Sequence, residues 1–363
     1  SRETLMSLLR EIVFVEPTLV GLLGGCALHA ACWLAIHNWE WGGMKHIKHA
    51  VQKYLPYKTI QRNFDGDPAV ELFGMEKDPG LVYVWNAGVI LHHTIGGVLC
   101  LAGWYFGQPW LFRHGILTEV AGLDVLDLFY RVPLCFLAPP GPYPTSTLIK
   151  EGGKFAPYFY LQFFHHSVGM SVGFVSILYF AHLPDHQWFG FILMGGPFLA
   201  IAPGMLANLV PPEYYKVHVL DKFIQWAFFA VHQRAYYFFP ATYALVKNVI
   251  AQPIPNAAKV ATCYAAVAMT LFNLIVLLAC TDALRLALMG DKGSANAPTD
   301  TDCSHSHLRP RFSRRSSSIA ASTMATIFLQ LRSMDLGSTA RTAVLAHKWV
   351  AKVKVKQNPV KEA

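Results

Sequence analysis

The chain has 363 residues, of which 53% are hydrophobic and only 14% are charged. Soluble domains carry roughly a quarter charged residues, so this composition excludes an ordinary soluble globular protein and predicts membrane-spanning helices. The formal net charge of +8 is not concentrated in a basic domain. It therefore argues against nucleic acid as a partner and favours anionic lipid head groups.

Runs of about 20 apolar residues predict helices that cross a membrane. Seven such runs lie at about 14–37, 81–106, 111–137, 155–183, 187–210, 219–246 and 258–288. The third run is interrupted by Glu119, Asp124 and Asp127. Because Lys and Arg gather in the odd-numbered connections and in the tail, the positive-inside rule predicts an external N-terminus and a cytosolic C-terminus.

The segments outside these runs differ in composition. A short N-terminal segment (1–13) precedes the first span, and an extramembrane connection (38–80) follows it. From residue 289 to 363 the chain is basic and mostly without apolar periodicity, which predicts a disordered C-terminal tail. Within this tail, 323–334 and 340–354 have the pattern of short amphipathic helices lying on a membrane.

Two stretches place adjacent histidines inside apolar runs: "LHHTIGG" (Leu91–Gly97) and "FHHSVGM" (Phe164–Met170). His92 lies 11 residues into its span and His165 lies 10 into its own. At ~1.5 Å per residue, both are about 15 Å deep, near the middle of a ~30 Å hydrocarbon core. Polar side chains at that depth usually face the bundle interior or a cavity, although they also serve as hydrogen-bonding contacts between helices. Since neighbours on a helix point ~100° apart, each pair should turn one histidine inward.

Three chemistries suit these histidines. In the first, His92 and His93 act as a general base beside Asp124 and Asp127, which are three residues apart on one helix face, and activate a hydroxyl or amine for acyl transfer. In the second, one histidine of each pair ligates a haem between two helices. The third, a di-iron centre, needs clustered histidine boxes, but only "HLPDH" (182–186) has the HxxxH spacing. We therefore expect no metal site.

A further candidate is Arg234, within the aromatic-rich stretch "FIQWAFFAVHQRAYYFFPATY" (223–243) that also contains Pro240. An arginine in a span needs an acid, a backbone carbonyl or a lipid head group, or it extends to the membrane surface. The functional interpretation is an anchor for a lipid phosphate or carboxylate.

These motifs together resemble the TLC domain, the six-helix membrane domain of ceramide synthases, TRAM-type proteins and CLN8-type proteins. That family carries an HH pair followed some seventy residues later by an aromatic-rich helix with Arg and Pro, as do His165, His166, Arg234 and Pro240 here. A competing register resembles the ceramide-synthase pattern, in which His92 and His93 are followed by "RHG" (113–115) and "DVLDLF" (124–129). In this register Leu123 stands where the synthases have a histidine.

The resemblance implies an all-α, polytopic integral membrane helix bundle with a TLC-like core (81–246) and one additional span (258–288). It implies a protein of the endoplasmic reticulum or another endomembrane that binds, senses or transfers a long-chain lipid. As an enzyme it would use acyl-CoA as donor, with catalytic residues His92, His93, Asp124 and Asp127. As a binding protein it would hold a head group with His165, His166 and Arg234. A b-type haem protein and a structural subunit of a larger membrane complex remain open alternatives.

Overall fold

The computed structural model describes residues 2–39, 41–65, 67, 70, 75–125, 128–129 and 166–295. The described residues form helices and connections without a strand. The helices are α1 (Arg2–Val13), α2 (Leu19–His37), α3 (Gly43–Tyr54), α4 (Tyr57–Phe64), α6 (Leu81–Phe106), α7 (Pro109–Glu119), η1 (Val120–Val125), η3 (Ser176–Phe180), α11 (Pro184–Ala207), α12 (Tyr215–Ile224), η4 (Gln225–Tyr237), α13 (Phe238–Ala251) and α14 (Asn256–Ala295). A helical segment at 166–175 leads into η3. The η segments are π-helical.

Four described helices are long and apolar enough to cross a membrane: Leu19–His37, Leu81–Phe106, Pro184–Ala207 and Asn256–Met289. The prediction of an all-helical membrane protein is confirmed at this level, and the count of seven spans stays a prediction. The fourth predicted span is represented by the shorter apolar helix His166–Phe180.

The predicted sixth span (219–246) lies within a continuous helical stretch from Tyr215 to Ala251, which consists of α12, η4 and α13. It differs from the four apolar helices because Asp, Lys and Arg side chains are buried along it together with glutamines, namely Asp221, Lys222, Gln225, Gln233 and Arg234. A helix that buries so many polar groups must turn them toward the protein interior, because lipid offers them no hydrogen bonds.

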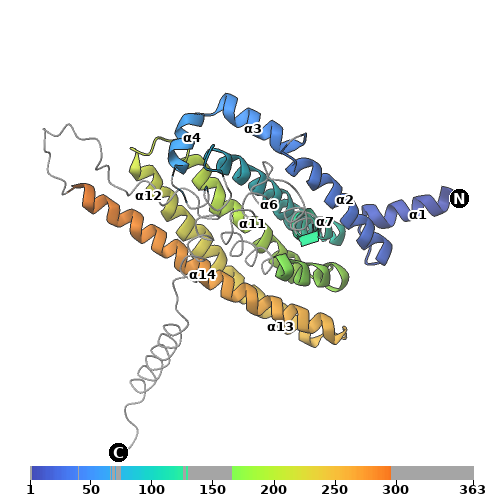
Figure 1. The fold of residues 1–363 in the computed structure, drawn as a ribbon. Helices are drawn as coiled ribbons and strands as arrows, with labels where there is room; N and C mark the ends of the chain where they lie inside the picture. The colour runs from blue at the N-terminus through green and yellow to red at the C-terminus, as the bar shows by residue number, and fades with distance from the viewer. Residues whose placement is uncertain are drawn as a thin grey trace, which may run out of the picture.

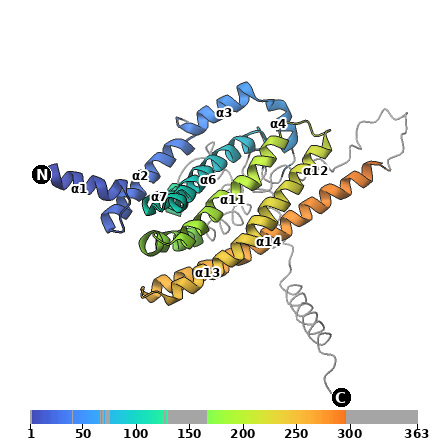
Figure 2. The same ribbon diagram turned by 180° about the vertical axis from the view of Figure 1, so that it is seen from behind.

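The helices form one bundle in which α6 and α11 are the central pair (Figure 1). On one side, α7 packs against α6, and η1 packs against α2. On the other side, η4 contacts both α11 and α14, so that α6, α11, η4 and α14 follow one another across the molecule (Figure 2). This order brings the residues of four distant sequence segments around a common interior.

Glycine sets the separation of the central pair. A Cβ atom on Gly97 would lie 2.9 Å from Cα of Gly195, closer than side-chain carbons pack. The backbones of α6 and α11 can therefore approach directly, in the manner of small-residue contacts between membrane helices. Gly97 follows the first histidine pair by one turn, so this contact fixes the height and rotation of that pair relative to α11.

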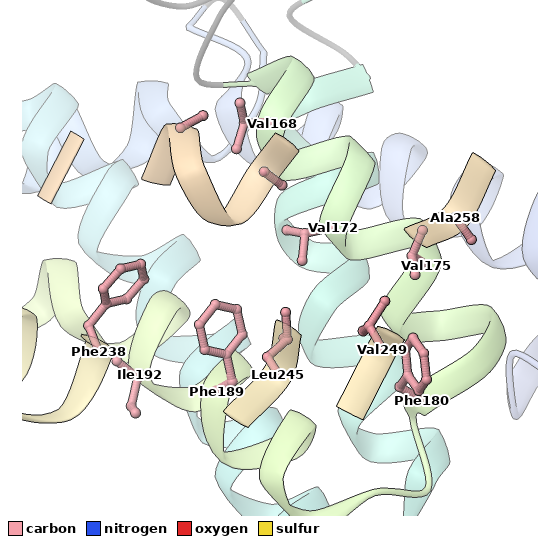
Figure 3. Close-up of a cluster of buried hydrophobic side chains, with 12 residues drawn as sticks. Val168, Val172, Val175, Phe180, Phe189, Ile192, Phe238, Leu245, Val249 and Ala258 are labelled. Atoms are coloured by element: carbon pink, nitrogen blue, oxygen red, sulfur yellow. The ribbon is translucent and has the colours of Figure 1, made fainter. Parts of the chain in front are cut away.

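Among the described residues, the largest apolar cluster joins the helix at 166–180 to α11, α13 and α14 (Figure 3). Val172 and Val175 face Phe189 of α11 and Leu245 and Val249 of α13 in this cluster. Burying an aliphatic or aromatic side chain stabilises a fold by about 1.5–3 kcal/mol relative to water, although membrane helices gain mainly from close packing. The cluster holds the second histidine-bearing helix against the rest of the bundle.

The predicted extramembrane connection (38–80) contains two helices, α3 and α4. Their apolar faces bury Met44, Ile60 and Phe64 against the start of α6. Asn63 fixes the end of α4, since its Nδ2 atom donates to the backbone oxygens of Asn208 (3.0 Å) and Val210 (2.9 Å). The connection therefore covers one end of the α6–α11 pair.

Two of the sequence predictions concern the C-terminal end of the described residues and the chain beyond it. The additional span (258–288) lies within α14, which continues to Ala295, past the predicted start of the tail at 289. The rest of the tail, including the predicted helices at 323–334 and 340–354, lies outside the described residues, as do His165 and Asp127.

Candidate functional site

The first histidine pair lies midway along α6 and meets an acid at the end of α7. His92 is fully buried, and its Nε2 atom lies 2.8 Å from Oε2 of Glu119. The same carboxylate oxygen is 3.7 Å from Nδ1 of His93. The two imidazole rings stand at 88° to each other with centroids 5.2 Å apart. Both histidines therefore converge on one carboxylate.

His92 turns away from the centre of the bundle and toward α2. Its ring packs against Trp33 with centroids 4.7 Å apart, and the ring of His37 lies 6.0 Å away. Trp33 and His37 are four residues apart and share one face of α2. This aromatic contact fixes the orientation of the His92 ring.

A second histidine contact lies farther along the same face of α2. Nε2 of His29 is 2.9 Å from Nδ1 of His114, whose Nε2 is 2.6 Å from the backbone oxygen of Val13. Because a carbonyl only accepts, Nε2 of His114 must donate, and in the neutral ring its Nδ1 accepts from His29. Sequence reasoning missed this pair, since the two residues stand in different predicted spans with no shared motif.

His166, the described member of the second histidine pair, lies beside a different acid. Nε2 of His166 is 3.9 Å from Oδ1 of Asp124, and both side chains are buried. A Cβ on Gly169 would lie 2.5 Å from Oδ2 of Asp124, so the glycine permits the close approach of η1 to this helix. Asp124 was predicted to serve the first pair, and the structure places it next to a member of the second.

Arg234 is buried in η4, with 5% of its surface exposed. Its guanidinium carbon lies 5.0 Å from the ring centroid of Phe229. Within the part of the chain that the structure describes, its Nε and Nη1 atoms make no hydrogen bond, and no carboxylate lies within 4.0 Å. A π-helical segment is unusual and is often found at functional sites, where its wider turn displaces side chains.

A cavity of about 200 Å³ lies between α6, α11, η4 and α14, and α7, η1 and the helix at 166–175 also contribute to its lining. Among the residues that the structure describes, its polar lining residues are His93, Glu119 and Arg234. Its other lining residues are apolar or glycine: Val89, Ile116, Val120, Gly169, Val172, Gly173, Leu193, Met194, Pro197, Ala200, Ile201, Phe229, Met269, Phe272 and Val276. The described part of the lining therefore combines a largely hydrocarbon surface with the cation of Arg234 and the pair of His93 and Glu119.

The structure thus divides the predicted site residues into two places. His93 and Arg234, predicted for two different roles, line the same cavity, whereas His92 lies behind His93. His166 and Asp124 form a separate contact nearby on η1 and the helix at 166–175. Glu119, which the sequence analysis noted only as an acid in the third span, is the partner of the first pair.

Three of these side chains also have the donor atoms of a metal site. His92, His93 and Glu119 each offer one ligand atom, and these atoms all lie within 4.8 Å of one another. Nothing in the spacing of these residues signals such a group, because Glu119 stands 27 residues after His92.

No protein-family model matches this chain, and comparisons with curated proteins and with solved structures found no match. The resemblance to TLC-domain proteins therefore rests on the short motifs alone.

Proposed function

We propose that this protein binds a long-chain lipid with an anionic head group inside the membrane, in the cavity between α6, α11, η4 and α14. The observation that carries the proposal is the position of Arg234, a buried cation at the wall of an otherwise largely apolar cavity.

The charge of Arg234 calls for a counter-ion. A buried charge is costly unless it is paired and hydrogen-bonded, and the described part of the chain offers Arg234 an aromatic ring but no carboxylate. A guanidinium binds carboxylates and phosphates through two parallel hydrogen bonds. A fatty carboxylate or a lipid phosphate would supply the missing charge and acceptors.

The rest of the lining suits the hydrocarbon part of such a ligand. Apolar side chains from α11 and α14, including Ile201, Phe272 and Val276, lie along the cavity. Ligand sites are typically apolar with a few polar groups that fix orientation, and this lining follows that pattern. The cavity therefore offers a cation to the head group of an amphiphile and apolar surface to its hydrocarbon chain.

The resemblance of the motifs to TLC-domain proteins adds a topology and a cellular location to the proposal. On its basis the protein is a TLC-like membrane protein with a six-helix core, seven spans and a cytosolic C-terminus, in the endoplasmic reticulum or a related endomembrane.

Acyl transfer is a second candidate, favoured by the position of His93 and Glu119 at the cavity wall. In this reaction an acceptor amine or hydroxyl attacks the thioester carbonyl of acyl-CoA, and His93 takes the acceptor's proton. The tetrahedral intermediate then expels the CoA thiolate, which receives that proton. A carboxylate beside the imidazole supports this role because it stabilises the imidazolium that forms.

The haem alternative is less favoured by the geometry. A haem held between the two histidine pairs needs a histidine of each pair at one cavity, but this cavity is lined by His93 alone among the described histidines.

Lipid analysis of the full chain, extracted in mild detergent, tests the binding proposal. We expect the wild-type protein to retain about one anionic lipid, and Arg234→Gln to lower its affinity at least about tenfold because a charge-assisted contact is lost. Arg285→Gln is the matched control, since Arg285 is exposed on α14 and paired with Asp282. Ala200→Leu should also displace the lipid by filling the cavity without changing charge.

Other outcomes contradict the proposal. Retention of the same lipid by Arg234→Gln, or lipid in the same proportions as the surrounding membrane, would remove it. A Soret band that shifts on reduction would establish the haem alternative. A stoichiometric protein partner without enriched lipid would establish a structural subunit. Acyl transfer is tested separately with labelled acyl-CoA and long-chain amine acceptors, where His93→Ala should abolish turnover.

A further inference from the structure

We propose that His92, His93 and Glu119 bind a divalent first-row transition metal ion, Zn²⁺ or Fe²⁺, at the wall of the cavity. This inference goes beyond lipid binding and does not depend on it, because it rests on the three side chains alone. It also departs from the expectation of no metal, which the sequence spacing supported.

The separations of the donor atoms suit one small ion. Around a tetrahedral ion with bonds of ~2.0–2.1 Å, neighbouring ligand atoms lie about 3.3 Å apart. Oε2 of Glu119 is 2.8 Å from Nε2 of His92 and 3.7 Å from Nδ1 of His93, on either side of that value. The third separation, between the ligand atoms of the two imidazoles, is within 4.8 Å, so small side-chain shifts would bring the three atoms onto an ion.

The use of two different ring nitrogens explains how adjacent residues can meet. Neighbours on a helix diverge by ~100°, so identical nitrogens of two adjacent histidines point to different places. Here His92 reaches Glu119 with the distal Nε2 and His93 with the proximal Nδ1. The near-perpendicular rings, at 88°, are consistent with approach from two directions.

Within the described part of the chain, one side of the group faces the cavity. His92 is fully buried and held against Trp33, whereas His93 and Glu119 line the cavity. In catalytic metal sites, three protein ligands leave one coordination position open, whereas structural metal sites are closed. The group of His92, His93 and Glu119 has the first arrangement. That position is where water or an oxygen of a bound molecule would coordinate.

The ligand set limits the choice of metal. Two imidazoles and one carboxylate suit Zn²⁺, or Fe²⁺ as in two-histidine, one-carboxylate sites, whereas Mg²⁺ and Ca²⁺ prefer sites made of oxygen ligands. The chain offers no thiolate among these three ligands, so a site for a softer metal is not indicated. The test distinguishes zinc from iron.

Elemental analysis of the untagged full chain, purified in mild detergent without chelator, is the first experiment. We expect about one equivalent of zinc or iron per chain. After removal of the metal with a chelator, Zn²⁺ should rebind at one site in competition with a chromogenic chelator. Co²⁺ should give visible absorption bands typical of nitrogen and oxygen ligands.

Variants assign the site to these residues. His93→Ala and Glu119→Gln should each lower Zn²⁺ affinity at least about 100-fold, since even outer contacts of metal sites contribute 10–100-fold. The double variant His46→Ala and His49→Ala is the control, because it removes an exposed histidine pair on α3 and should bind Zn²⁺ as the wild type does. Each variant is compared only after gel filtration shows the same monodisperse particle.

The proposal is overturned if monodisperse wild-type protein neither contains stoichiometric metal nor binds Zn²⁺ or Fe²⁺ at one site. It is also overturned if folded His93→Ala or Glu119→Gln binds Zn²⁺ with unchanged affinity. Should both variants fail to fold, X-ray absorption at the zinc edge of the wild type decides. Two imidazole nitrogens plus oxygen support the site, and sulfur or all-oxygen coordination contradicts it.

Discussion

Oε2 of Glu119 lies 2.8 Å from Nε2 of His92, although 27 residues and a turn between two helices separate them. The contact joins the middle of α6 to the last residue of α7. It forms because α7 returns antiparallel to α6 and packs closely along it. This single contact positions the histidine pair whose second member faces the cavity.

A double-mutant cycle measures this contact. In chelator-treated protein, His92→Leu and Glu119→Leu should each destabilise the fold by about 1–3 kcal/mol, because each removes the contact between the buried imidazole and the carboxylate. The double variant should be more stable than the sum of the two predicts, with a coupling of about 1–3 kcal/mol. Thermal unfolding in detergent is the measurement, and strictly additive effects would contradict the contact.

Gly97 should be sensitive to added bulk. Gly97→Leu forces a side chain into the backbone of α11, where even a Cβ would lie 2.9 Å from Cα of Gly195. Overpacking costs about 1–3 kcal/mol or more, so the variant should give little monodisperse protein in gel filtration. Val98→Leu is the control, since Val98 is 58% exposed on the outer face of the same helix. Equal yields of the two variants would show that α6 and α11 are not in direct contact.

Asn63 should hold α4 against the end of α11. Asn63→Ala removes two hydrogen bonds and leaves the carbonyls of Asn208 and Val210 without this donor, at a cost of about 1–3 kcal/mol. Amide hydrogen exchange in α4 should then become at least about tenfold faster. Lys58→Ala, an exposed position on the same helix, should leave exchange unchanged. Equal exchange rates in the two variants would contradict the attachment of α4 to the end of α11 through Asn63.

Tyr57 should make the connection sensitive to high pH. Its hydroxyl donates to Oδ1 of Asp78 at 2.7 Å, and burial together with this hydrogen bond raises the pKa of the tyrosine above its usual range. A raised pKa in the folded state means that the contribution to stability is complete below pH ~10 and is lost as the pH rises above it.

The melting temperature of the wild type should therefore fall more steeply above pH 10 than that of Tyr57→Phe. Tyr54→Phe, at a position that is 72% exposed, should keep the wild-type pH profile. Parallel profiles for all three proteins would mean that Tyr57 is not buried against Asp78.

The sequence predicted the class of structure because that class depends on composition and periodicity. Long apolar runs can satisfy their backbone groups in lipid only as helices, which explains the agreement over α2, α6, α11 and α14. The position of His92 near the middle of α6 follows from counting residues along one helix. The burial of Arg234 was one of two possibilities on the same ground, since a charge deep in a span either lies inside the protein or extends to the membrane surface.

The sequence by itself therefore determined an all-helical membrane protein with histidines at the middle of a span and a charged residue that needs a partner. Only the tertiary structure decided that Glu119 rather than Asp124 meets the first pair, that His93 rather than His92 lines the cavity, and that Arg234 lines that cavity too. Helix periodicity fixes the angles between residues on one helix. The rotation and height of one helix against another depend on side-chain packing between distant segments, such as Gly97 against Gly195, which no local pattern encodes.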